Sequence, residues 1–187
     1  MTRLSVTSLQ LDGLKLIERD SFEDLRGSFS RMFCSNELMS VGWSVPIAQI
    51  NHSYTASKGS VRGMHFQVPP YSEVKLVTCI SGEILDIVID IREGSDTFLN
   101  YHAEVLTAKN GRALLIPEGF AHGFQTLSNN VDLIYCHSKH YQSDAEAGIN
   151  PNDPLINIDW PLPISQISDR DKSRARLSSA FKGFNFV

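Results

Sequence analysis

Residues 111–122, GRALLIPEGFAH, carry the most informative pattern in this sequence. A turn glycine, Gly111, precedes a short apolar run, and Pro117-Glu118-Gly119 then returns the chain towards His122. Proline and glycine at such a corner separate two strands. The stretch therefore predicts a strand, a corner and a second strand, with His122 on the inner face of a barrel. Taken alone, His122 is more readily explained as a hydrogen-bonded histidine of the core.

Short strands are expected on both sides of this corner. Ser81-Gly82, residues 93–96 and Lys109-Asn110-Gly111 separate the apolar runs at residues 75–80, 83–92, 103–107, 113–116, 125–127 and 132–137. Strands of this length between Gly, Asn and Ser are typical of a sandwich or a small barrel. The sequence thus predicts an all-β protein.

The run at residues 84–92 alternates in character. One side is apolar throughout (Leu85, Ile87, Ile89, Ile91), whereas the other side includes Asp86 and Asp90. The apolar side is expected to pack against protein, because successive side chains of a strand point to opposite faces. The polar side faces either solvent or the lumen of an open barrel, and the pattern alone does not choose.

Two helices are expected outside the strands. Ser35 is a candidate N-cap for a helix through Met39, and Ser168 precedes acidic residues that favour a C-terminal helix over residues 172–181. Four prolines between residues 151 and 163 indicate an irregular, extended arm before that helix.

Composition restricts the class of protein. The 187 residues are 42% hydrophobic and 20% charged, which excludes a disordered, collagen-like or coiled-coil chain and fits one domain over residues 1–187. A net charge of −4 argues against nucleic-acid binding.

The cysteines and the apolar stretches indicate a compartment. Cys34, Cys79 and Cys136 are odd in number and widely spaced, so reduced packing thiols are expected rather than disulfides or a zinc site. The N-terminus lacks the apolar core of a signal peptide, and Asp86 and Asp90 interrupt the most apolar stretch. A cytoplasmic protein without a membrane span is predicted.

Several polar residues are candidates for acid–base chemistry. Arg62 and His65 are three apart beside a glycine, and Lys75 lies among apolar residues, where a charge is costly to bury without an anion. Each candidate also has a structural explanation. Lys75 would reach water from an edge strand, Tyr135 would be a core tyrosine, and Asp171 would close a capping box with Ser168.

A metal site is a weaker alternative. A metal-binding cupin would offer two histidines one residue apart and then a glutamate, whereas this chain has His65-Phe66-Gln67. His65, Glu73 and His122 remain a possible ligand set, but a ligand is missing from the pattern. A metal-free barrel fits better.

Read together, these motifs resemble the dTDP-4-dehydrorhamnose 3,5-epimerase family of metal-free cupins, from about residue 10 to residue 175. The matching strings are Arg26-Gly27-x-Phe29, residues 49–53, residues 61–67, residues 75–77, Gly82-Glu83-x-x-Asp86-x-x-x-Asp90-x-Arg92, residues 116–124, Tyr135, Tyr141, Glu146-x-Gly148, residues 152–154, residues 158–161 and residues 168–171. So many matches in order are specific to the family.

The resemblance implies a cupin-type jelly-roll homodimer, without a cofactor, acting on a nucleoside-diphospho-4-keto-6-deoxyhexose. His65 would be the base, Asp171 its partner, Tyr135 the acid on the opposite face, and Lys75 the group that stabilises the enolate. The substrate-contact positions of the family match Arg26, Gln49, Asn51, Arg62, His122 and Glu146. Asp86 is expected to orient His122.

Five positions depart from the family pattern. Arg31 stands where the family usually has a substrate-contacting glutamate, and Arg170 stands for a lysine; both are predicted to contact substrate. Ser28 and His140 replace aromatic residues near the nucleobase, and Glu73 replaces a glutamine. The acid–base set is complete while the nucleotide end is altered, which indicates retained chemistry on a different nucleotide, sugar or set of stereocentres.

Two other functions stay open. The chain would be a catalytically idle barrel that binds sugar nucleotides, or a metal-dependent cupin enzyme. The homodimer has a separate argument from sequence, because Leu9 with Leu11 and Leu14 with Leu16 have no evident partner in a small barrel. Pairing with a neighbouring chain would bury them.

Overall fold

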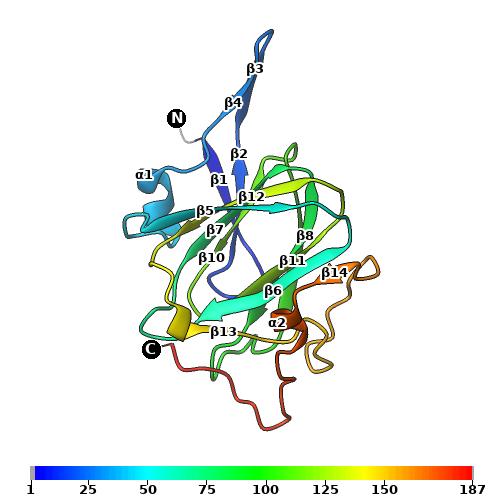
Figure 1. Cartoon of the computed structure of the whole chain (residues 1–187). Coiled ribbons are helices and arrows are strands. Elements are labelled where there is room, and N and C mark those ends of the chain that lie inside the picture. Colours follow the sequence, from blue (N-terminus) through cyan, green and yellow to red (C-terminus); the bar gives the residue numbers. More distant parts are fainter. Residues whose placement is uncertain (1–2, 187) are drawn as a thin grey trace.

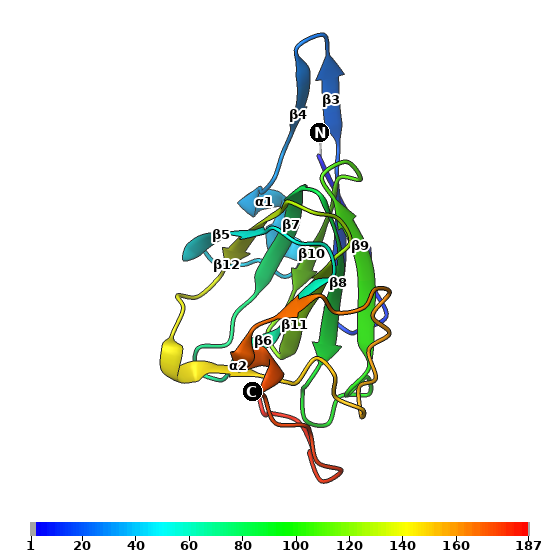
Figure 2. The same ribbon diagram turned by 45° about the vertical axis from the view of Figure 1, so that its right-hand side comes forward.

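Two antiparallel sheets face each other and enclose a barrel in the computed structural model, which describes residues 3–186 (Figure 1). The first sheet has the order β1-β2-β10-β7-β12-β5 and the second the order β13-β6-β11-β8-β9, with β14 added in parallel to β6. Figure 2 shows the two sheets from the side, with β14 and α2 beside the strands of the second sheet. The predicted all-β jelly-roll class is confirmed.

The strands and helices have the following bounds. The first sheet consists of β1 (Leu4–Ser8), β2 (Lys15–Arg19), β10 (Arg112–Ile116), β7 (Lys75–Ser81), β12 (Val131–His137) and β5 (Gln49–Thr55). The second consists of β13 (Glu146–Gly148), β6 (Ser60–Gln67), β11 (Phe120–Thr126), β8 (Glu83–Asp90), β9 (Tyr101–Thr107) and β14 (Gln166–Ile167). A hairpin of β3 (Ser21–Asp24) and β4 (Gly27–Ser30) and the short helices α1 (Ser35–Leu38), η1 (Met39–Val41), η2 (Ser143–Ala145) and α2 (Asp169–Lys172) complete the elements.

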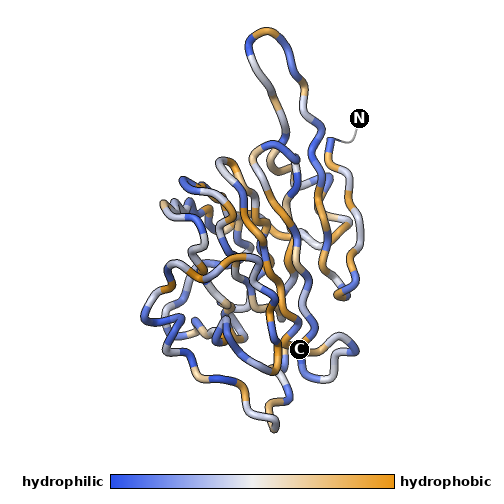
Figure 3. The backbone as a smooth tube through the Cα atoms, turned by 90° about the vertical axis from the view of Figure 1, so that its right-hand side faces the viewer, coloured by the Kyte–Doolittle hydropathy of each residue, from blue (hydrophilic) through white to orange (hydrophobic). Residues whose placement is uncertain are grey.

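The main core fills one end of the space between the sheets. Its fully buried members come from both sheets and include Val77, Val88, Leu114 and Leu133. Figure 3 shows the matching hydrophobic stretches along the barrel strands. Burying apolar side chains between two sheets is the main favourable contribution to such a fold.

The N-terminal leucines belong to this same core, which corrects the expectation that they lack a partner. Leu11, Leu14 and Leu16 are buried in it, and Leu9 packs against it. The chain turns back at residues 12–13, where the Leu14 amide bonds to the Leu11 carbonyl at 3.0 Å, and so directs the leucines between the sheets. They therefore give no argument for a dimer.

Two smaller clusters cover the outer faces of the sheets. Leu38 and Trp43 pack over Ile17 and Leu115 of the first sheet. On the second sheet, Ile149 and Ile156, with the partly buried Phe184 and Phe186, pack against Met64, Phe66, Ile87 and Ile89. Each sheet is thus covered on both faces over much of its area.

The polar side of strand β8 faces the lumen of the barrel and not solvent. Ile87 and Ile89 lie in the outer cluster, while Val88 lies in the core between the sheets. Asp86 is fully buried and hydrogen-bonded to His122, which places this side chain in the lumen rather than in solvent.

The predicted C-terminal helix over residues 172–181 is wrong. The helix α2 ends at Lys172, and the segment beyond it runs without regular helix. The side-chain amide of Asn150 donates to the backbone carbonyls of Lys172 and Arg174 at 3.2 and 2.8 Å. The Asp153 carboxylate accepts the backbone N–H of Leu177. These bonds occupy the backbone groups that a longer helix would use. At α1 the N-cap is Cys34, one residue before the expected Ser35.

The β3–β4 hairpin projects from the barrel (Figure 1). Its apolar side chains Phe22, Leu25 and Phe29 are exposed to 50%, 107% and 71%. Three large apolar side chains exposed on one small element are typical of an interaction site. Within residues 3–186, no helix is long and apolar enough to cross a membrane.

Candidate functional site

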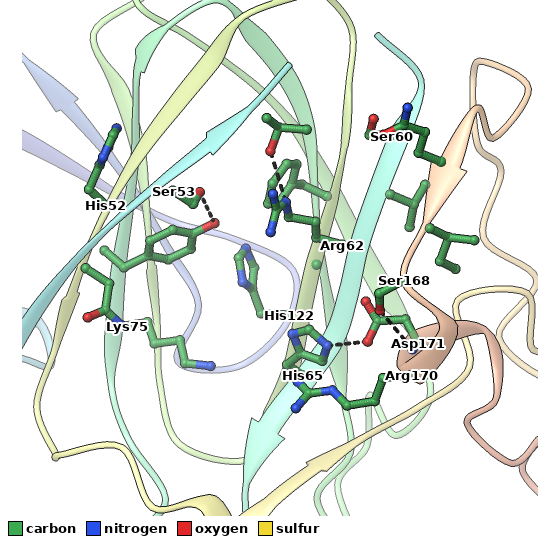
Figure 4. A pocket seen from close by; sticks show the side chains of 18 of the residues that line it. His52, Ser53, Ser60, Arg62, His65, Lys75, His122, Ser168, Arg170 and Asp171 are labelled. Atoms are coloured by element: carbon green, nitrogen blue, oxygen red, sulfur yellow. Dashed lines mark hydrogen bonds and ion pairs between the residues drawn. The ribbon is translucent and has the colours of Figure 1, made fainter. Parts of the chain in front are cut away.

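A pocket of about 920 Å³ opens between the two sheets, beside the main core (Figure 4). Strands β5, β7 and β12 of the first sheet and β6, β11 and β14 of the second line it, with α2 at its edge. Its polar and charged lining includes Asn51, His52, Ser53, Arg62, His65, Lys75, His122, Tyr135, His137, Ser168, Arg170 and Asp171. A volume of this size holds a ligand larger than a monosaccharide.

His65 and Asp171 form a hydrogen-bonded pair on one wall. The His65 Nε2 lies 2.6 Å from Asp171 Oδ1, and Asp171 is almost fully buried whereas the His65 side chain is 32% exposed. Burial alone would raise the pKa of Asp171, but the hydrogen bond and charge of His65 outweigh it and hold that pKa below its usual value. The ionised carboxylate fixes Nε2 as the protonated nitrogen, which leaves Nδ1 free to take a proton.

The backbone around Asp171 explains why the residue serves His65 rather than only its own helix. The Ser168 hydroxyl caps α2 by accepting the Asp171 amide at 3.0 Å. The Asp171 carboxylate turns to β6 and accepts the Gly63 amide at 3.3 Å as well as His65. Ser168 is thus the predicted N-cap, but the Asp171 carboxylate does not close a capping box and is directed at His65 instead.

Glycine at position 63 allows β6 and β11 to approach closely. A Cβ on Gly63 would lie 2.6 Å from the Gly123 Cα and 2.8 Å from the His122 carbonyl oxygen, and its φ is +126°. Only glycine fits this backbone without displacement. The close approach puts His65 directly opposite His122 in the strand register.

His122 faces the pocket and is held from behind by Asp86, as expected. The Nε2 of His122 lies 2.7 Å from Asp86 Oδ1, and both side chains are buried. Burial raises the pKa of Asp86, and the charge and hydrogen bond of His122 oppose that rise.

Tyr135 lies on the other sheet. Its ring packs at 6.1 Å edge-on to His122, and its hydroxyl is 3.4 Å from the Ser53 hydroxyl. Burial raises the pKa of Tyr135 well above its usual value, so the phenol is protonated at neutral pH. A protonated phenol on β12 thus faces an imidazole on β6 across the pocket.

Lys75 extends into the same space, towards His65 and His122 (Figure 4). It is buried, and its ammonium pairs with Glu73 at 3.0 Å. The interpretation of Lys75 as an edge-strand lysine that reaches water is wrong, because β7 lies inside the first sheet between β10 and β12.

Two arginines border the pocket, Arg62 on β6 and Arg170 on α2. The Arg62 guanidinium donates to the Thr55 hydroxyl and the Tyr54 carbonyl at 3.0 and 3.1 Å. Arg170 forms an ion pair with Glu146, which also accepts the Tyr141 hydroxyl at 2.5 Å. Guanidinium groups held in this way bind phosphate oxygens well.

The structure brings eight of the twelve predicted site residues together in the pocket: His65, Tyr135, Asp171, Lys75, Asn51, Arg62, His122 and Arg170. Gln49 and Glu146 do not line the pocket but contact residues that do. Gln49 hydrogen-bonds to Asn51 at 2.9 Å, and Glu146 accepts from Arg170. Arg26 pairs with Asp24 on the projecting hairpin, and Arg31 pairs with Glu37 of α1. Neither arginine lines the pocket of its own chain.

Sequence reasoning missed His137, which lines the pocket beside Tyr135. The rings of Tyr135 and His137 stack with centroids 6.1 Å apart and 22° between their planes. The signal was available, because residues two apart on a strand share a face. Ser53 was also missed, although it lies in a string that matches the family.

The alternative metal set does not assemble. His65, Glu73 and His122 are each bonded to other groups, namely Asp171, Lys75 with His137, and Asp86. In the part of the chain that the structure describes, no three His, Cys, Asp or Glu side chains are grouped to hold a metal ion.

The chain is similar to proteins of one kind. The family model described as dTDP-4-dehydrorhamnose 3,5-epimerase matches residues 8–179. The dTDP-4-dehydrorhamnose 3,5-epimerase of Shigella flexneri is 39% identical over 169 residues, which cover 90% of this chain and 93% of the relative.

Solved structures of such epimerases are similar to this chain in fold as well as in sequence. The epimerase of Legionella pneumophila in complex with dTDP-4-keto-L-rhamnose has a TM-score of 0.91 and 34% identity, over 98% of this chain and 99% of that one. A 4-keto-6-deoxy sugar epimerase from the novobiocin gene cluster of Streptomyces spheroides has a TM-score of 0.89 and 32% identity, over 94% and 88%.

The lowered pKa of Asp171 predicts a pH-dependent stability. A carboxylate whose pKa is lower in the folded than in the unfolded state stabilises the fold above about pH 4, and this contribution disappears as pH falls through the folded value. We expect the gap in unfolding free energy between wild type and Asp171→Asn to be largest above about pH 5 and to close on acidification. Urea denaturation of both proteins across this range measures it, and a gap that does not change with pH contradicts the assignment.

Proposed function

The chain belongs to the dTDP-4-dehydrorhamnose 3,5-epimerase family and is a sugar-nucleotide epimerase, and on that premise we propose its substrate class and the role of each pocket residue. The substrate is a nucleoside-diphospho-4-keto-6-deoxyhexose, and C-3, C-5 or both are inverted. The observation that carries the proposal is the opposed placement of the His65–Asp171 pair and Tyr135 on the two sheets, with Lys75 lining the same pocket.

His65 is the base. A ketone at C-4 acidifies the protons on C-3 and C-5, so a neutral imidazole is able to remove one of them. The C–H electron pair moves into the ring, and the carbonyl becomes an enolate. Asp171 stabilises the imidazolium that forms, because its carboxylate stays ionised at 2.6 Å from Nε2.

Tyr135 is the acid on the opposite face. Its O–H bond breaks as a new C–H bond forms on the face away from His65, the enolate returns to a ketone, and the carbon is inverted. The phenolate then regains a proton from solvent while the imidazolium loses one, so no atom is gained or lost. The carbonyl of the substrate supplies the activation, and the steps require no cofactor.

Lys75 stabilises the charge that develops on the enolate oxygen. A buried ammonium aimed at that oxygen interacts more strongly than one in water, because little solvent screens it. Asn51, Arg62, His122 and Arg170 bind the rest of the substrate, with the arginines suited to the diphosphate. Gln49 and Glu146 support this set through their bonds to Asn51 and Arg170.

The active form is a homodimer in which the β3–β4 hairpin of one protomer reaches its partner. Phe22, Leu25 and Phe29 need a covering surface, and Arg26 at the hairpin tip is predicted to contact substrate although it lies outside its own pocket. A twofold dimer satisfies both requirements with the same contact. Arg31, at the base of the hairpin, remains a predicted substrate contact in the same arrangement.

Dimer assembly is testable in solution. Light scattering is expected to give about twice the 20.9 kDa of one chain at micromolar concentration. Phe29→Asp should weaken assembly at least roughly tenfold, since burying a phenylalanine contributes about 1.5–3 kcal/mol. Leu155→Asp alters an exposed leucine of the proline-rich arm and serves as the control. A monomeric wild type contradicts the proposal.

The reaction is tested by incubation in deuterated water with dTDP-, CDP-, GDP- and UDP-4-keto-6-deoxyhexoses, followed by NMR of the ring protons. The dTDP sugars are the first choice, because the relatives are named for them. His65→Asn is expected to lower exchange at every ring position by at least ~10²–10⁴-fold while nucleotide binding is kept. Exchange within about tenfold of wild type would show that His65 is not the base.

Tyr135→Phe separates the acid from the base. The substitution removes one hydroxyl and keeps the ring, so the fold should change little. His65 would still remove protons and return deuterium to the same face, so exchange continues while inversion falls by roughly 10²-fold or more. Near-normal inversion would mean a purely structural Tyr135, and equal loss of both would mean that Tyr135 positions substrate.

A further inference from the structure

Glu73 is a buried carboxylate beside the pocket with no role in the reaction described above. Its side chain is 7% exposed, and three donors surround it. Oε1 accepts from Lys75 Nζ at 3.0 Å, and Oε2 accepts from Gln67 Nε2 at 3.0 Å and from His137 Nδ1 at 3.2 Å. Burial alone would raise the pKa of Glu73, but the His137 hydrogen bond and the charge of Lys75 hold it below its usual value.

The contact with Glu73 fixes the orientation of His137. Since Nδ1 donates to the carboxylate, Nε2 points the other way, where it lies 3.4 Å from the Asn51 side-chain nitrogen on the pocket wall. His137 is directly opposite Lys75 in the register of β12 and β7. Glu73 therefore holds two neighbouring side chains that both face the pocket.

This pair has the same form as the two others in the site. His65 with Asp171 and His122 with Asp86 each join an imidazole in the pocket to a carboxylate behind it. His137 with Glu73 is a third such pair, on the opposite sheet. It differs in that the carboxylate binds Nδ1 rather than Nε2 of the imidazole and also pairs with a lysine.

We propose that Glu73 is a positioning residue for the epimerase reaction, which fixes the Lys75 ammonium by an ion pair and holds His137 turned towards the substrate, and that His137 Nε2 is a further substrate contact. The proposal rests on the proposed enolate role of Lys75. A lysine in a buried site loses its charge readily unless an anion accompanies it. Glu73 provides that anion without entering the pocket itself.

The other charged groups near Lys75 do not replace Glu73. His137 approaches from β12, His65 from β6 and His122 from β11, and none of these carries negative charge. Asp86 of β8 contributes to the same field, but its hydrogen bond goes to His122. Among residues 3–186, Glu73 is the carboxylate in ion-pair contact with the Lys75 ammonium.

The first experiment compares the pH profile of kcat in wild type and Glu73→Gln. Glutamine keeps the size and an acceptor oxygen but removes the negative charge, so the buried ammonium at position 75 is left without its ion-pair partner. We expect the alkaline limb of kcat to move to lower pH and kcat at neutral pH to fall roughly tenfold, equivalent to about 1.4 kcal/mol. The KM should change less than kcat.

Glu118→Gln is the matched control. Glu118 accepts the Ser72 hydroxyl at 2.5 Å and so supports the same 72–74 segment without contacting Lys75 or His137. A purely structural effect of loosening this segment would appear in both variants. The proposal requires the displaced alkaline limb in Glu73→Gln alone, and equal displacement in both variants, or none in either, overturns it.

The second experiment uses His137→Asn. Asparagine retains a donor near the position of Nδ1, so Glu73 and Lys75 stay in place, but it lacks Nε2. We expect kcat/KM to fall about tenfold with the alkaline limb unmoved. An unchanged kcat/KM shows that His137 does not touch substrate.

Failure of the proposed function and failure of the Glu73 role give different results. If wild type exchanges no ring proton on any nucleotide sugar, the proposed function fails and the role of Glu73 falls with it. If wild type is active while Glu73→Gln has the wild-type rate and pH profile, only the inference about Glu73 fails.

Discussion

Strands β6, β11 and β8 are hydrogen-bonded so that His65 lies opposite His122, and His122 lies opposite Val88. Across the pocket, β7 and β12 pair Lys75 with His137 and Val77 with Tyr135. Because side chains of a strand alternate between its faces, a slip of one residue in either sheet would turn these groups out of the lumen. The antiparallel register of the two sheets is thus the constraint on which the site depends, and the close approach of Gly63 to Gly123 is part of it.

The pocket also depends on three buried carboxylates. Carboxylates at positions 73, 86 and 171 are each nearly inaccessible to solvent, and each has a histidine as a partner. An unpaired buried charge would cost several kcal/mol, so these pairs offset the burial of the carboxylates and fix the orientation of the imidazole rings. A pocket with its dipoles already oriented needs little reorganisation when an enolate forms, which is the usual source of electrostatic catalysis.

The N-terminal region shows how one segment serves two purposes. Residues 9–16 complete the core between the sheets, and the chain then leaves the barrel as the β3–β4 hairpin with its phenylalanines exposed. The leucines of residues 9–16 already lie in or against the core of the monomer. Only the hairpin, with its exposed apolar side chains, is available to a partner.

The amino-acid sequence by itself determined the strands from residue 75 to residue 137, the corner at residues 117–119 and eight of the residues that line the pocket. Alternation, turn residues and motif spacing are local properties, so they can be read without a structure. The tertiary structure alone decided which distant groups meet. Glu73 and His137 are 64 residues apart, and Asn150 and Asp153 hold the backbone that was expected to form a C-terminal helix. Such contacts join residues far apart in the chain, and local periodicity carries no information about them.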